Sequence, residues 1–156
     1  MNEKEFSKLI KKDRYQIFLF ESSLSFPFNL FSHHWFICSE KGKISRWEIL
    51  FRRNKNKKMG HLYKDFLPPI YGIEIIPFYQ KFFWKGKIKG IFEGNKNSQA
   101  KKMINFIKKS NENYPYKYEY HFISGPNSNT FAQWVIDKFP KCKFKLSWKS
   151  IGKNYS

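Results

Sequence analysis

A polar run late in the chain, Asn127-Ser128-Asn129-Thr130, holds the residues best suited to chemistry. All four residue types are good helix N-caps, and the apolar residues that follow recur at helical spacing. A hydroxyl at the start of a helix lies near unpaired N–H groups and the positive end of the helix dipole, which stabilise developing negative charge. Ser128 could therefore act as a nucleophile if a base removes its proton. The competing interpretation is that these side chains only cap the helix.

Histidines are the natural candidates for that base, because a neutral imidazole accepts a proton near neutral pH. The chain has His33, His34, His61 and His121, with neither HxxxH nor HExxH spacing, so no metal site is expected. His33 and His34 are adjacent. On a strand they would point to opposite faces, and only one of them could face a given site.

The cysteines offer little chemistry. Cys38 and Cys142 form no CxxC pair, so they are expected to be free thiols and not zinc ligands, with a single disulfide between them as the alternative. The chain also lacks a glycine-rich phosphate loop, and no cofactor is predicted.

The formal net charge of +18 admits two interpretations. It could serve a polyanion such as nucleic acid or an anionic membrane. Alternatively it is compositional, since Lys, Asn, Ile and Phe are all abundant, as in proteins of AT-rich genomes. We prefer the compositional interpretation because the lysines are spread along the whole chain. A nucleic-acid-binding domain that uses basic loops such as residues 52–58 remains an alternative.

Strands precede helices along the chain. Strands are expected at residues 15–20, 34–39 and 44–51, with the last two forming a hairpin, and further strands at 71–78, 82–92, 118–123 and 144–148. The 82–92 stretch is expected to form either one strand or a hairpin with residues 85–87 at its tip. Helices are expected after Asn97 or Ser98, and from Asn127 or Asn129 to Phe139, where Pro140 ends the second one. Residues 1–14 are either a short helix or a frayed end. This order predicts one α+β domain over residues 1–156, an antiparallel sheet with the late helices packed on it.

The start of the chain has no features of a signal peptide, and the apolar run at residues 17–20 is too short to span a membrane. The expectation is a cytoplasmic protein without a transmembrane segment.

Three groups of residues resemble a known family when taken in order. The first is His33-His34-Trp35-Phe36-Ile37, followed by Arg46-Trp47-Glu48-Ile49. The second is Tyr114-Pro115-Tyr116, followed by Gly125-Pro126-Asn127-Ser128-Asn129-Thr130-Phe131 and Trp134-Val135. The third is Ile151-Gly152-Lys153-Asn154-Tyr155. Together they resemble an uncharacterised bacterial family of unknown function over about residues 15–155.

This layout is similar in turn to the circularly permuted papain-like hydrolases and acyltransferases of the NlpC/P60 and lecithin:retinol acyltransferase type. Those proteins have an early His on a strand and, much later, an Asn-Cys-x-x-Phe motif at the start of a helix. Ser128 stands here at the position of the Cys. The resemblance implies a papain-like cleft with the following residues: Ser128 as nucleophile, His33 as base, Glu48 to orient the base, and Asn127, Asn129 and Trp35 to bind substrate.

Because a serine replaces the cysteine, the first hypothesis is a binding module that recognises a peptide, glycan or lipid in this cleft. The second is a hydrolase or acyltransferase acting on an amide or ester through Ser128 and His33. The third is the basic nucleic-acid-binding domain.

Overall fold

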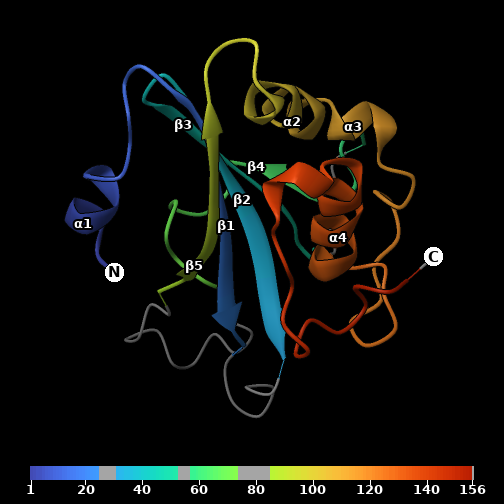
Figure 1. Cartoon of the computed structure of the whole chain (residues 1–156). Helices are drawn as coiled ribbons and strands as arrows, with labels where there is room; N and C mark the ends of the chain where they lie inside the picture. The colour runs from blue at the N-terminus through green and yellow to red at the C-terminus, as the bar shows by residue number, and fades with distance from the viewer. Residues whose placement is uncertain (25–30, 53–56, 74–84, 156) are drawn as a thin grey trace.

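A five-stranded antiparallel sheet forms the centre of the fold, with strand order β4-β3-β2-β1-β5 (Figure 1). The computed structural model describes residues 1–24, 31–52, 57–73 and 85–155. The strands are β1 (Tyr15–Ser23), β2 (Ser32–Glu40), β3 (Lys43–Ile49), β4 (Leu62–Lys64) and β5 (Lys87–Gly94). The predicted α+β class is confirmed. The permuted papain-like arrangement stays a prediction.

The expected hairpin is formed by β2 and β3. Phe36 pairs with Trp47, and Glu40 pairs with Lys43 at the turn. Lys41 and Gly42 connect the strands with φ angles of 52° and 89°. Two consecutive positive φ values match the type of two-residue turn whose twist suits a hairpin.

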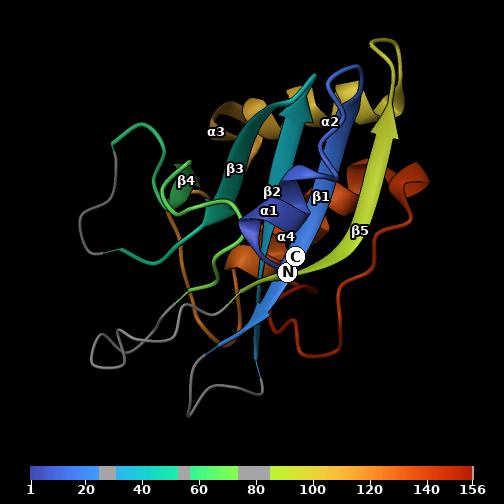
Figure 2. The ribbon, with the colours of Figure 1, turned by 90° about the vertical axis from the view of Figure 1, so that its left-hand side faces the viewer.

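Helices cover both faces of the sheet. They are α1 (Glu3–Ser7), α2 (Gln99–Lys108), α3 (Ser110–Asn113), α4 (Ser128–Lys138) and the 3-10 turn η1 (Pro140–Cys142). Helices α2 and α4 pack on one face, and Figure 2 shows α1 on the other. No helix within the described ranges is long and apolar enough to cross a bilayer.

The central strands are buried on both sides. Ile17 and Leu19 of β1 point toward α2 and α4, while Phe18 and Phe20 point toward Phe6 of α1. On β2 the same alternation places His34, Phe36 and Cys38 on the α4 side. It places His33, Trp35 and Ile37 on the α1 side.

Several expected strands are wrong. Residues 118–123 and 144–148 are irregular, and Lys87 begins β5 instead of ending a hairpin tip. Phe144 packs across β5, so close that a Cβ at Gly90 would lie 2.5 Å from its ring. The alternation of apolar and polar residues in 144–148 therefore reflects side chains packing onto the sheet, and not a strand paired with it. Residues 74–78 and 82–84 of the expected strands lie outside the described residues.

Trp134 lies on the apolar stripe of α4, a position that favours burial. It is partly buried, with its ring 4.6 Å from Phe106 and 5.2 Å from Tyr114. The ring lies at the edge of the core, where α2, α3 and α4 meet.

Candidate functional site

The start of α4 is capped by Asn127. Its Oδ1 accepts hydrogen bonds from the backbone N–H groups of Asn129 (2.9 Å) and Thr130 (3.3 Å), and Thr130 Oγ1 accepts from Asn127 N in return (3.1 Å). Ser128 is the first helical residue. Its hydroxyl has no hydrogen-bond partner among the described residues. The cap is thus made by the residues around Ser128, which leaves the Ser128 hydroxyl free for another partner.

The C-terminal motif is packed against this cap. Asn127 Nδ2 donates to the Ile151 carbonyl (3.1 Å), and Thr130 Oγ1 donates to the Gly152 carbonyl (2.6 Å). Gly152 has a φ of +84°, and a Cβ there would lie 2.4 Å from the Asn127 amide. This close approach explains why two motifs more than twenty residues apart in the sequence belong to one site.

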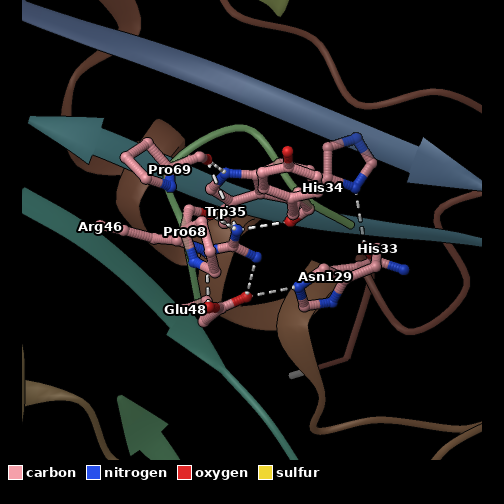
Figure 3. A network of polar contacts seen from close by, with 9 residues as sticks. His33, His34, Trp35, Arg46, Glu48, Pro68, Pro69 and Asn129 are labelled. Atoms are coloured by element: carbon pink, nitrogen blue, oxygen red, sulfur yellow. Dashed lines mark hydrogen bonds and ion pairs between the residues drawn. The ribbon is translucent and has the colours of Figure 1, made fainter. Parts of the chain in front are cut away.

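His33 lies near the start of β2 and is held by Glu48 of β3. Its Nε2 lies 2.9 Å from Glu48 Oε2, and both side chains are buried. Figure 3 shows the carboxylate between the imidazole and the guanidinium of Arg46. Arg46 Nη2 donates to Glu48 Oε2 at 2.7 Å, and Arg46 Nε lies 2.6 Å from Oε1. Since Glu48 is an acceptor, the imidazole donates through Nε2 and leaves Nδ1 as the basic nitrogen.

Arg46 also ties this group to the segment after β4. Its Nη1 donates to the carbonyls of Pro68 (2.6 Å) and Tyr71 (2.5 Å). The guanidinium lies 4.3 Å above the ring of Trp35, whose indole N–H donates to the Pro69 carbonyl (2.8 Å). Trp35 is fully buried in this packing, so its visible role is to support His33 and Arg46.

Burial and neighbouring charges shift the pKa values of His33 and Glu48 in opposite directions. Burial lowers the pKa of His33 below its ordinary value of 6.5, although the hydrogen bond to Glu48 partly opposes the effect. Burial also disfavours the ionised form of Glu48. The hydrogen bond from His33 and the charge of Arg46 outweigh that cost and lower the Glu48 pKa. The arrangement therefore favours a neutral imidazole beside an ionised carboxylate.

His34 occupies the other face and forms a separate network. Asn129 Nδ2 donates to the carbonyls of Ser32 (3.0 Å) and Ile151 (2.9 Å), which fixes Asn129 Oδ1 as an acceptor. His34 Nδ1, 2.8 Å away, must then be the donor. On its other side, His34 Nε2 lies 3.4 Å from Glu21 Oε1. This network joins β1, β2 and the start of α4, and it engages Nδ1, the nitrogen that faces the helix.

A cavity of about 410 Å³ lies between the end of the sheet and the start of α4. Its polar side is formed by Ser32, His33, Asn127, Ser128 and Asn129. Its other walls are apolar or aromatic: Leu24, Phe31, Leu50, Phe51, Ile73, Tyr120, Phe122 and Ile151. Glu48 and Trp35 do not line it. Ser128 and His33 thus both line this cavity although β2 directs His33 away from the α4 face of the sheet.

Ser128 and His33 face this cavity without bonding to each other. Among the described residues, neither the Ser128 hydroxyl nor His33 Nδ1 makes a hydrogen bond. The Ser128 backbone N–H, in the first turn of α4, has no partner within its helix either. The two lining residues thus carry one basic nitrogen, one hydroxyl and one N–H donor without a partner among the described residues. No three His, Cys, Asp or Glu side chains within the described ranges are grouped to hold a metal.

Sequence reasoning missed two parts of the site. Arg46, two residues before Glu48 on one strand, shares its face, and this spacing was a usable signal. The apolar walls come from segments far apart in the sequence, from Leu24 to Ile151, whose convergence depends on the tertiary fold.

Comparison with known proteins gives a family and no function. A family of proteins of unknown function (DUF3750) matches residues 15–155, and the chain belongs to it. No curated protein and no solved structure matches the chain.

Proposed function

We propose that the protein binds a small, mainly apolar ligand whose polar end carries a hydrogen-bond acceptor, such as a carboxylate or an ester carbonyl. The observation that supports this most is the combination of apolar cavity walls with the free Ser128 hydroxyl, the Ser128 N–H and His33 at one end. Ligand sites typically pair an extensive apolar lining with a few convergent polar groups that fix orientation.

The partial positive charge at the start of α4 favours a ligand with a hydrogen-bond acceptor at its polar end. The N-terminus of α4, with its positive dipole end and the uncapped Ser128 N–H, lines the cavity, which suits an anionic or carbonyl oxygen. The Ser128 hydroxyl can donate to the same oxygen. Asn127 and Asn129 line the cavity, but their amides are committed to the cap and to His34, so they shape the polar end without being free to bind.

A second candidate function, acyl transfer from an ester or amide, is favoured by one further observation. Glu48 holds His33 Nε2, which leaves Nδ1 as the base in the cavity that Ser128 lines. Nδ1 would accept the Ser128 proton as Oγ attacks the acyl carbon, and the Ser128 N–H would stabilise the oxyanion. His33 would then give the proton to the leaving group, and water would release the acyl group by the same route. The absence of a direct Ser128–His33 hydrogen bond makes binding the first proposal.

Binding is tested with a fluorescent dodecanoate, whose emission changes on entering an apolar cavity. We expect saturable binding at one site per chain. Ile151→Trp, which fills the cavity, should abolish it, and Ser128→Ala should weaken it about three- to tenfold by removing one hydrogen bond. Ser124→Ala, an exposed serine nearby, is the matched control and should bind like the wild type. Binding that survives Ile151→Trp unchanged would refute the proposal.

Acyl transfer is tested separately with a fluorophosphonate probe and intact-protein mass spectrometry. If Ser128 is a nucleophile, the wild type should gain one adduct, whereas Ser128→Ala and His33→Ala should not. Dodecanoate binding without any adduct would leave the binding function and remove the catalytic one.

A further inference from the structure

Two large apolar side chains lie exposed beside the cavity. Trp148 is 78% exposed and Ile123 is 67% exposed. Trp148 and Ser124 line one shallow surface hollow, and Ile151 lines both this hollow and the cavity. Ile123 lies between Ser124 and Phe122, which is a wall residue of the cavity. The two exposed side chains thus belong to the segments that enclose the ligand site. We call Ile123, Trp148 and Lys149 the docking patch.

The chain segment that carries Trp148 and Lys149 is basic. Residues 138–153 include six lysines and no acidic residue. The Lys149 ammonium lies 5.5 Å from the centre of the Trp148 ring, and Lys153 lines the same hollow as Trp148. An exposed aromatic ring beside lysines, with an exposed aliphatic side chain on the segment that borders the same hollow, is the composition of a surface that lies in the headgroup region of an anionic bilayer.

Ile123, the aliphatic residue of the docking patch, favours membrane binding over nucleic-acid binding. Trp148 could stack on a base, and the lysines could contact phosphates. Ile123 can do neither. Its side chain is 67% exposed, and moving this apolar surface from water into an apolar phase lowers the free energy. A bilayer interface accommodates all three members of the patch together.

We propose that the docking patch binds the surface of an anionic membrane and that the cavity takes its ligand, a lipid acyl chain, from that membrane. The proposed membrane binding depends only on the exposure and charge of the docking patch. The ligand part of the proposal rests on the proposed binding function, because Ile151 and Phe122 place the patch next to the cavity.

Docking is tested by cosedimentation of the full chain with vesicles of phosphatidylcholine alone and with about 30% phosphatidylglycerol. We expect binding to the anionic vesicles only, weakening as salt rises. Trp148→Ala and Ile123→Ser should each weaken it about five- to tenfold. Ile91→Ser is the matched control, because Ile91 is also exposed but lies on β5, paired with Phe18 on the α1 side of the sheet. It should bind like the wild type.

Three outcomes would overturn docking: no binding to anionic vesicles, equal loss in Ile123→Ser and Ile91→Ser, or a patch needed for single-stranded DNA but not for vesicles. Ser128→Ala should dock normally. Wild-type docking together with failure of dodecanoate binding would therefore refute the proposed function and the acyl-chain ligand while leaving docking in place.

Discussion

Replacing Arg46 with methionine should be among the most damaging single changes in the chain. Arg46 is 1% exposed, pairs with the buried Glu48 carboxylate, and donates to the Pro68 and Tyr71 carbonyls. Removing one partner of a buried ion pair costs about 3–5 kcal/mol, because the other charge stays buried without compensation. Domains of this size have only about 5–15 kcal/mol of stability, so the variant should be marginally folded.

Urea denaturation followed by circular dichroism at neutral pH measures this loss. Arg52→Met is the matched control, since Arg52 is exposed and its main contact is the ring of Phe66, at 4.0 Å. It should cost less than about 1 kcal/mol. Adding Glu48→Leu to Arg46→Met should restore part of the stability by removing the uncompensated charge. A loss below about 1 kcal/mol for Arg46→Met would show that Glu48 is not held as described.

Further outcomes follow from the cap, the carboxylates and the thiols. Asn127→Ala should cost about 1–2 kcal/mol in urea denaturation, because two backbone N–H groups lose their acceptor. Glu21 and Glu48 have folded-state pKa values below the ordinary 4.5, so they stabilise the fold above that pH and lose this contribution as the pH falls. Unfolding free energy should therefore drop on acidification in a pH series, and it should drop less in Glu21→Gln. Cys38 and Cys142 are buried free thiols whose pKa values are raised by burial. An aromatic disulfide reagent should label them slowly in the native protein and quickly in urea.

The sequence predicted the elements marked by a continuous apolar run, a turn or a helical period. The strand at Tyr15 and the hairpin around Gly42 are present, and the helix at Ser98 begins where its cap predicts. Central strands that are buried on both faces have continuous apolar runs in the sequence, and β1 and β2 could therefore be predicted. Residues 118–123 and 144–148 have the same composition, but they bury their aromatics by packing across other segments. Local sequence does not distinguish that packing from strand pairing.

The site was predictable where it depends on local chemistry. Asn127 caps the helix as its residue type indicates, and His33 and His34 point to opposite faces as strand alternation requires. The different partners of the two histidines were predicted only in part, because the resemblance paired Glu48 with His33 but gave no partner for His34. The full set depends on Glu48 and Arg46 occupying the same face of the sheet as His33 on the neighbouring strand, and on Asn129 reaching His34 from α4. These contacts depend on strand register and helix placement.

The most direct test of the central claim is ligand protection of a cysteine placed at position 128. In Ser128→Cys, an apolar maleimide should label this cysteine, because residue 128 lines the cavity while Cys38 and Cys142 are buried elsewhere. Saturating dodecanoate should slow the labelling about tenfold or more, since the acyl chain and the reagent would compete for one apolar cavity. Labelled protein should no longer bind the fluorescent dodecanoate. A labelling rate that is the same with and without dodecanoate, in protein that still binds it, would place the ligand elsewhere and contradict the account.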